Sequence, residues 1–243
     1  MSKAIFTEVR RDIYLETWLK YYSHFFNDIY LVNTNPDQLD SYIEKAKNKY
    51  KFVVIKDYPN PEWSMEISRN HIKDFQRKLL EKYNWVLFAH ADEFIVPDPN
   101  KYRGLGDYIR RCEKDYVFCS GYDILQMYQE KDGELDEPAL DLTKSILKQR
   151  KYWLPTKSYC KPLLSRVPLN WAQGFHRIDK VEDGNLEEIK DKDLYLCHLK
   201  CADYTIFGER QSTGKGIGAD KGYDWFYKEH DKRELIPERV KVF

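Results

Sequence analysis

The 243-residue sequence has no long hydrophobic run and no excess of charge of either sign. Lysine and arginine together number 40, and so do aspartate and glutamate. Without a net positive field, the chain lacks the usual electrostatic means of recruiting nucleic acid or an anionic membrane. No apolar stretch approaches the roughly 20 residues that a membrane span needs, and residues 1–6 lack the apolar segment of a secretory signal. We therefore expect a cytoplasmic protein, with peripheral membrane contact left open, that acts on small molecules.

Cysteine is scarce and unpatterned. The chain has five cysteines, an odd number, and no CxxC pair. This argues against a disulfide framework and against a cysteine zinc site. The sequence also lacks internal repeats and low-complexity tracts. A chain of this length favours one α/β domain with a sizeable core over two full domains.

The first ninety residues alternate between short apolar strands and amphipathic helices. Strands are predicted at 4–8, 29–32, 52–55 and 85–88, and helices at 12–26, from about 36 and from about 68. This alternation predicts a parallel sheet covered on both faces, whose ligands bind beyond the carboxyl ends of the strands. Farther along, the alternation weakens, with a short helix at 105–111 and strands at 117–119 and 194–199. We therefore expect one domain with a nucleotide-binding half, 1–98, and an acceptor-shaping half, 99–243.

The segment 85–97, WVLFAHADEFIVP, is the sharpest feature of the sequence. A buried strand ends there in side chains that can bind a metal ion, namely His90, Asp92 and Glu93. Hard carboxylate oxygens suit a divalent cation, and diphosphate oxygens can complete its coordination shell. Such a cation would offset the charge that develops on a departing diphosphate. The alternative is that Asp92 and Glu93 cap a turn and stay solvated.

The segment 85–97 resembles the DxD-DEF motif of GT-A glycosyltransferases, specifically the family 2-like and family 92-like proteins. Further matches run in the same order from about residue 4 to 207: the opening at 8–22, KPLL at 161–164, WAQGFH at 171–176 and CHLK at 197–200. The resemblance implies an α/β fold of GT-A type, with a doubly wound, mostly parallel central sheet and a mixed C-terminal portion. It also implies a hexosyltransferase-like enzyme that moves a sugar from a nucleotide-diphosphate sugar to a hydroxyl acceptor, such as a glycan or a lipid-linked acceptor.

The resemblance also assigns metal ligands. It implies Asp92 as the main ligand and His198 as the distant ligand that completes the shell. The first acid of the family's motif is replaced by His90, which is then expected near the ribose or the metal. Imidazole is a good ligand for transition metals and a poor one for magnesium, so Mn²⁺ is favoured over Mg²⁺. Metal-independent nucleotide binding stays open.

Other candidate site residues come from the remaining strand ends and motifs. For the nucleotide they are Glu8 and Asn33 at the base or ribose, and Arg69, Asn70 and Lys200 at the diphosphate. The candidate general base is Asp123, with Glu93 second. The candidate acceptor contacts are Trp171 and His176. Each of these residues has a structural alternative as a helix cap, a surface residue or a core residue. The glycine-rich run 214–218 is either a lid over the diphosphate or a surface loop.

Two other functions remain open at this point. The replacement of the first motif acid by His90 is compatible with a non-catalytic GT-A relative that binds a sugar or a partner protein. A metal-dependent hydrolase could be built from His90, Asp92, His176 and His198. The sequence has no compact histidine motif such as HExxH, which counts against the hydrolase.

Overall fold

The computed structural model describes residues 1–11, 13–34, 36–55, 64–127, 137–179, 189–207 and 232–241. Its strands are β1 Lys3–Val9, β2 Asp28–Asn33, β3 Val53–Ile55, β4 Trp85–Phe88, β5 Glu93–Pro97, β6 Tyr116–Leu125, β7 Tyr152–Pro155, β8 Pro162–Ser165, β9 Lys190–His198 and β10 Glu234–Leu235. Its α-helices are α1 Leu15–Tyr22, α2 Pro36–Lys47, α3 Met65–Leu80 and α4 Leu105–Arg111. Short 3-10 turns include η1 Leu147–Gln149, η2 Lys157–Tyr159, η3 Gln173–Phe175 and η5 Glu238–Val240. Among the described helices, none is long and apolar enough to cross a membrane.

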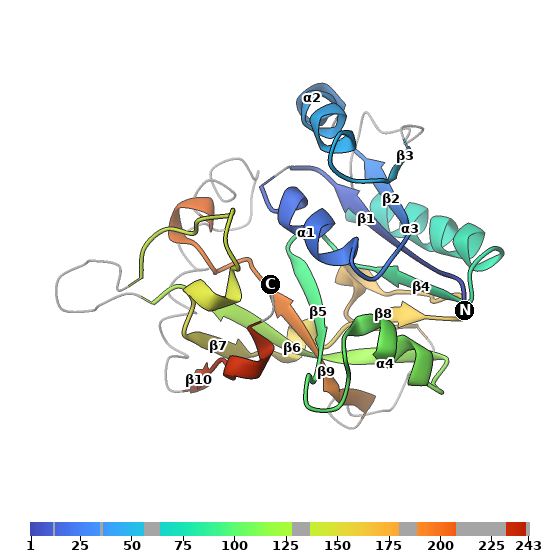
Figure 1. Cartoon of the computed structure of the whole chain (residues 1–243). Helices are drawn as coiled ribbons and strands as arrows, with labels where there is room; N and C mark the ends of the chain where they lie inside the picture. The colour runs from blue at the N-terminus through green and yellow to red at the C-terminus, as the bar shows by residue number, and fades with distance from the viewer. Residues whose placement is uncertain are drawn as a thin grey trace.

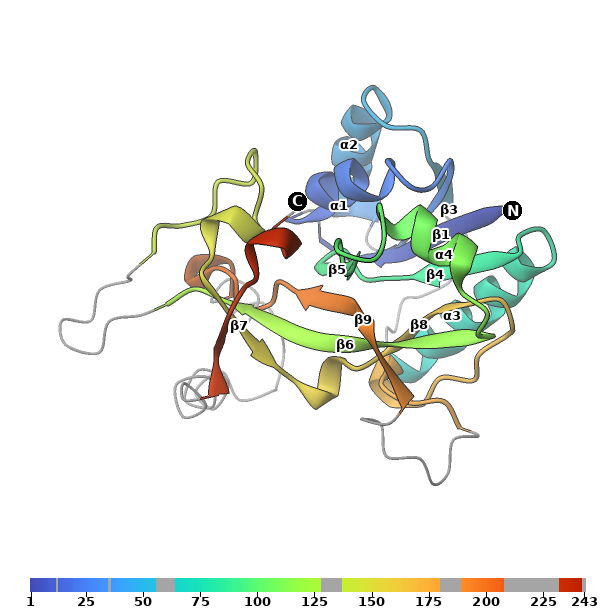
Figure 2. The same ribbon diagram turned by 60° about the horizontal axis from the view of Figure 1, so that its bottom comes forward.

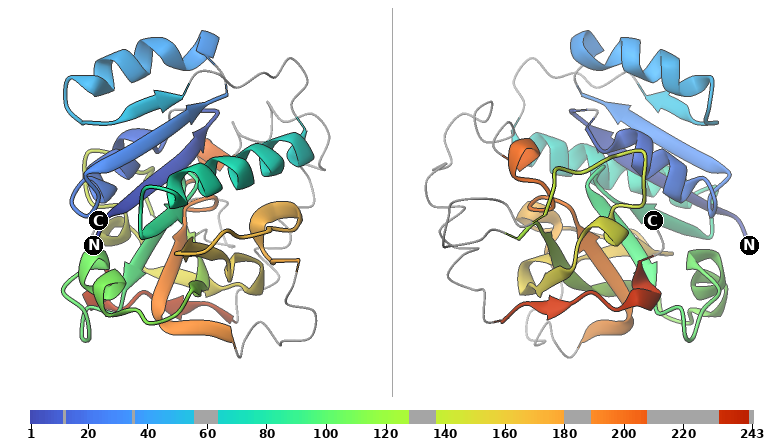
Figure 3. Two further views of the ribbon diagram at one scale, coloured as in Figure 1. Left: turned by 90° about the vertical axis from the view of Figure 1, so that its right-hand side faces the viewer. Right: turned by 60° about the vertical axis from the view of Figure 1, so that its left-hand side comes forward.

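The N-terminal part is a parallel sheet in the order β3-β2-β1-β4 (Figure 1). Every residue of β4 is buried, as are all residues of β1 after the first, because helices cover both faces of this sheet. Helices α1 and α3 lie on opposite sides of it (Figures 2 and 3). On the α3 side, Phe75 packs edge-on against Phe6 of β1, with ring centroids 5.3 Å apart. On the α1 side, the Tyr21 hydroxyl donates to the Ile95 carbonyl of β5 at 2.8 Å.

Local chemistry sets the ends of these helices. The Ser64 hydroxyl accepts a hydrogen bond from the Ile67 backbone N–H at 3.1 Å, so α3 begins at Met65, earlier than the predicted start near 68. Helix α1 ends at Tyr22, earlier than predicted. There the Phe25 N–H bonds the Tyr22 carbonyl at 2.9 Å, an i to i+3 bond that tightens the last turn and stops the helix.

The C-terminal part is antiparallel or mixed and continues the same sheet. Strand β8 joins β4, and the ten-residue strand β6 pairs with β8 and then β7. The sequence predicted a short strand at 117–119 here, and the structure has one longer strand with Gly121 in its interior. Strand β9 lies between β6 and β5 (Figure 2). The predicted fold class, α/β with a central sheet that is mostly parallel in its core and a mixed C-terminal portion, is confirmed.

The register across β5, β9 and β6 is the feature of the fold that builds the site. His198, the last residue of β9, is paired with Glu93 on one neighbouring strand and with Asp123 on the other. Directly paired residues on adjacent strands bring their side chains within contact distance on one face. A residue from the motif segment and two from the C-terminal half therefore meet at one place.

Candidate functional site

Asp92, His198 and Asp123 form a continuous chain of side chains. The His198 Nδ1–H donates to Asp123 Oδ1 at 2.7 Å, and His198 Nε2 lies 3.5 Å from Asp92 Oδ2. The three residues are 7%, 6% and 1% exposed, so they form a buried polar cluster that reaches the surface only narrowly. The Leu199 N–H donates to the Asp92 carbonyl at 2.9 Å, which ties the turn after β4 to the end of β9. We call these three residues the Asp–His–Asp chain.

The electrostatics of this chain favour a positive charge on its middle member. Burial alone lowers the pKa of His198, but the carboxylates of Asp92 and Asp123 outweigh burial and raise this pKa above its ordinary value. An ionised carboxylate can only accept hydrogen bonds, so Asp123 fixes the proton on Nδ1 and leaves Nε2 directed at Asp92. The Thr156 hydroxyl lies 3.3 Å from the other Asp123 oxygen and 3.1 Å from the Leu154 carbonyl, and its single hydrogen is shared between them. Asp123, predicted as the general base, is thus buried with both oxygens within hydrogen-bond distance of a partner, and it orients His198.

A second cluster, with Glu93 and Lys161 buried and His90 partly exposed, lies beside the Asp–His–Asp chain. Lys161 Nζ is 2.6 Å from Glu93 Oε1, and His90 Nδ1 is 3.2 Å from Glu93 Oε2. Burial raises the pKa of Glu93, but Lys161 and His90 outweigh it and hold that pKa well below its usual range. A carboxylate that is 1% exposed and held in this way is a poor general base, so the geometry gives Glu93 a structural role. His90, with 30% of its side chain exposed, is committed to Glu93 through Nδ1.

His176 lies near Lys161 and Tyr159, with its ring centroid 6.2 Å from that of Tyr159. Two consecutive residues with positive φ, Gly174 at 74° and Phe175 at 62°, present its ring. The backbone strain at Phe175 is of the kind that accumulates at functional sites. Burial, reinforced by Lys161, lowers the pKa of His176 to about 4. Its Nδ1 is buried and has no hydrogen-bond partner among the described residues. At neutral pH the ring is therefore uncharged.

The depressed pKa of His176 makes stability depend on pH. Its ordinary value is 6.5, so between pH 6.5 and about 4 the unfolded chain binds this proton and the folded chain does not. The free energy of unfolding should fall by about 2 kcal/mol over that window, a value discounted for the partial exposure of the ring. His176→Asn should flatten this part of the profile in urea unfolding at pH 7, 6, 5 and 4.5. Parallel profiles for the two proteins would contradict the assignment.

The nucleotide-binding candidates at the first strand ends are spread over the neighbouring edge. The Ser68 hydroxyl of α3 donates to the Glu8 carboxylate, which places Glu8 at the N-terminal turn of that helix. Arg69 Nε is buried without a hydrogen-bond partner among the described residues, and Asn70 is exposed. The Asn33 amide donates to Asp40 Oδ1 at 2.9 Å, so part of its hydrogen-bonding capacity serves the packing of α2.

Lys200 and Trp171, which were expected at the diphosphate and the acceptor, have packing contacts. Lys200 Nζ lies 5.8 Å from the centre of the Phe207 ring. Trp171 is fully buried, and its indole N–H donates to the Pro162 carbonyl at 2.9 Å. Trp171 therefore offers no exposed ring face to an acceptor sugar, and the described contacts support the core alternative. The predicted lid at 214–218 lies outside the described residues.

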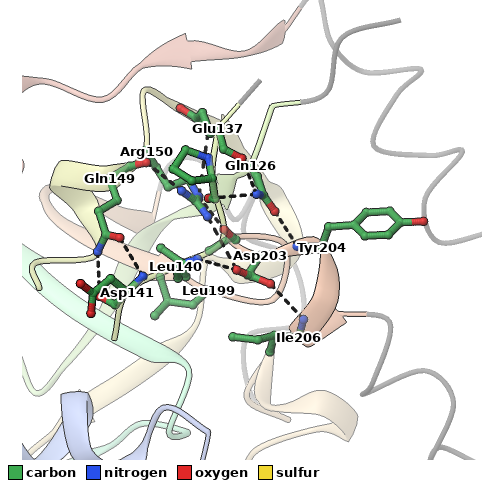
Figure 4. A network of polar contacts seen from close by, with 12 residues as sticks. Gln126, Glu137, Leu140, Asp141, Gln149, Arg150, Leu199, Asp203, Tyr204 and Ile206 are labelled. Atoms are coloured by element: carbon green, nitrogen blue, oxygen red, sulfur yellow. Dashed lines mark hydrogen bonds and ion pairs between the residues drawn. The ribbon is translucent and has the colours of Figure 1, made fainter. Parts of the chain in front are cut away.

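A buried arginine fixes the segment that follows His198 (Figure 4). Arg150 is 1% exposed, and its Nε donates to the Ala202 carbonyl at 2.5 Å. Its guanidinium is 3.9 Å from the carboxylates of Glu137 and Asp203. Each carboxylate also accepts two backbone N–H groups, from Met127 and Lys151 to Glu137 and from Leu140 and Ile206 to Asp203. The network holds the end of β9 to the neighbouring loops and so stabilises the position of the site.

The donor set of the Asp–His–Asp chain fits a divalent transition-metal ion. Asp92 offers carboxylate oxygen, His198 offers Nε2, and Asp123 on Nδ1 is the kind of outer partner that metal-bound histidines have. No group of three or more His, Cys, Asp or Glu among the described residues is arranged to hold a metal by itself. The fit is thus to an ion with two protein ligands whose other positions are filled by substrate oxygens or water, as is common at nucleotide sites. The four-residue hydrolase site finds no support among these residues.

Three of the predicted site residues are therefore brought together, and others are not. Asp92, His198 and Asp123 are in contact, with Glu93 and His90 adjacent. Tyr159, whose ring covers His198, and the role of Lys161 were not predicted from the sequence. A lysine six residues beyond a strand end carries no signal by itself, because its partner is 68 residues away in the chain.

Comparisons with known proteins give only distant likenesses. No protein-family model and no curated protein sequence matches the chain. A 4-diphosphocytidyl-2C-methyl-D-erythritol synthase structure aligns with 68% of this chain and 74% of its own, at 11% identity and a TM-score of 0.35. A glycosyltransferase involved in the glycosylation of the major capsid of PBCV-1 aligns over 56% and 57%, at 13% identity and a TM-score of 0.26. A CMP:2-keto-3-deoxy-manno-octonic acid synthetase complexed with CTP aligns over 98% and 92%, at 8% identity and a TM-score of 0.32. At these TM-scores the superpositions carry no functional argument. The proposed function depends on the geometry of the site.

Proposed function

We propose that this chain transfers a sugar from a nucleotide-diphosphate sugar to a hydroxyl acceptor, with assistance from a divalent cation. The observation that carries the proposal is the Asp–His–Asp chain, which lies at the turn where β4 ends. A mostly parallel sheet binds its ligands at this edge, and the N-terminal turn of α3 with Glu8 and Arg69 lies at the same edge. The ordered resemblance to GT-A motifs supports the same reading.

In this proposal Asp92 and His198 Nε2 hold the cation, preferably Mn²⁺. The cation would supply charge stabilisation for the departing diphosphate. Asp123 would keep the proton on His198 Nδ1, so that cation binding releases the Nε2 proton to solvent and exposes the Nε2 lone pair. Arg69, near the N-terminal turn of α3, adds a positive charge for the diphosphate oxygens. His176, which is uncharged at neutral pH, is proposed to lie on the acceptor side of the site.

Titration of UDP and GDP into the protein, with and without Mn²⁺, tests this function. We expect binding of one diphosphate that strengthens at least about tenfold when Mn²⁺ is present, together with slow hydrolysis of the matching nucleotide sugar. Absence of binding under both conditions would contradict the proposal. Binding without hydrolysis or transfer to any acceptor would favour the non-catalytic relative. Release of phosphate from simple esters without nucleotide preference would favour the hydrolase.

A further inference from the structure

Tyr159 stacks face to face on the central histidine of the site. The ring centroids of Tyr159 and His198 are 3.9 Å apart, and their planes differ by 27°. Each nitrogen of His198 lies near a carboxylate, with Nδ1 2.7 Å from Asp123 and Nε2 3.5 Å from Asp92. The torsion that rotates an imidazole about its Cβ–Cγ bond has broad minima, so the plane of the His198 ring must be fixed by its contacts. A flat ring at van der Waals distance blocks that rotation.

The backbone of Tyr159 is held unusually close to β6. A Cβ atom at Gly121 would lie 2.3 Å from the Tyr159 carbonyl carbon and 2.6 Å from its oxygen. Glycine is therefore required at 121 for space, and this close approach sets the height of the Tyr159 ring. The Gly121 carbonyl also accepts the Thr156 N–H at 2.9 Å, which fixes the segment that leads into η2.

The surroundings of Tyr159 keep its ring neutral and ordered. Burial, followed by the charges of Asp123 and Asp92, raises the pKa of Tyr159 far above its ordinary value. Lys161 Nζ lies 5.5 Å from the centre of the ring, within reach of a cation–π interaction. The ring therefore covers His198 without adding a third negative charge to the cluster.

We propose that Tyr159 is a positioning residue that fixes the plane of His198, so that Nε2 faces Asp92 and Nδ1 faces Asp123. The inference deepens the proposed function, because His198 is one of the two proposed cation ligands. The flat face of the Tyr159 ring fixes His198, and the Tyr159 hydroxyl takes no part in this. Tyr159→Phe should consequently preserve the orientation of the His198 ring, whereas an aliphatic side chain of similar volume should not.

Nuclear magnetic resonance of the metal-free full chain tests the inference without requiring turnover. In the wild type and in Tyr159→Phe, we expect a slowly exchanging Nδ1–H signal for His198 and upfield-shifted ring protons. In Tyr159→Leu both features should be lost, and Mn²⁺ affinity should fall about 10-fold or more, as for other partners of metal ligands. Tyr159→Met is the second aliphatic variant should Tyr159→Leu fail to fold.

Retention of both His198 signals in a folded Tyr159→Leu or Tyr159→Met protein would overturn the inference. So would their loss in Tyr159→Phe, because the hydroxyl would then be the operative group. Failure of the proposed function would show itself differently, as absence of nucleotide binding with the His198 signals intact. The two failures are therefore distinguishable.

Discussion

Lys161→Met is expected to lower the free energy of unfolding by about 3–5 kcal/mol, because it leaves the buried Glu93 carboxylate without its main counter-ion. The pair is 2.6 Å apart, and the two side chains are 6% and 1% exposed, so water cannot replace the lysine. His90 only partly compensates, since its ring contacts the other Glu93 oxygen at 3.2 Å. Urea unfolding at pH 7 measures the effect.

The double variant Lys161→Met/Glu93→Gln is the matched control for this prediction. It removes both charges, so it should recover a large part of the stability lost in the single variant. Lys114→Met is a surface control, because its ion pair with Asp191 leaves 54% of the lysine side chain exposed, and it should change stability by about 0.5 kcal/mol or less. A Lys161→Met protein as stable as wild type would show that the buried pair is not formed.

Asp92→Asn is expected to reduce Mn²⁺-dependent transfer or donor hydrolysis by roughly 100-fold or more, with little change in fold. The amide keeps the shape of the side chain but removes the charge that holds a cation, and it also removes one of the two carboxylates that raise the pKa of His198. Steady-state rates across a range of Mn²⁺ concentrations provide the measurement.

Asp74→Asn is the charge-matched control for Asp92→Asn. Asp74 lies on α3 with 67% of its side chain exposed and a loose 3.8 Å pair with Arg77, so its loss should leave turnover unchanged. Equal rates for the Asp92 variant and the wild type would contradict the role of Asp92.

Much of the fold could be predicted from sequence periodicity. The first four strands were predicted because continuous apolar runs such as WVLF suit a sheet covered on both faces, and α4 was predicted with its observed bounds. The end of α1 and the start of α3 were missed because they depend on single hydrogen bonds at the helix ends. The full length of β6 was missed, because it runs through Gly121, which serves a close backbone contact with Tyr159.

The candidate site was predictable only in part, for a related reason. Asp92 carries a local signal, since it follows a buried strand, and the family resemblance suggested His198. The partners that define their chemistry come from distant segments: Asp123 lies 75 residues from His198, and Lys161 lies 68 residues from Glu93. Trp171 shows that a local signal can also mislead. An aromatic residue beside a glycine and a histidine looks the same in sequence whether it faces a ligand or the core.

The proposal that Asp92 and His198 hold the cation can be tested by electron spin-echo spectroscopy of Mn²⁺ bound to the protein together with a nucleoside diphosphate. We expect a nitrogen coupling from one histidine ligand, which disappears in His198→Gln and persists in the control His24→Gln, whose histidine is exposed in the wild type. Bound Mn²⁺ without any nitrogen coupling, or a coupling that survives in His198→Gln, would contradict the assignment of Asp92 and His198 as the cation site.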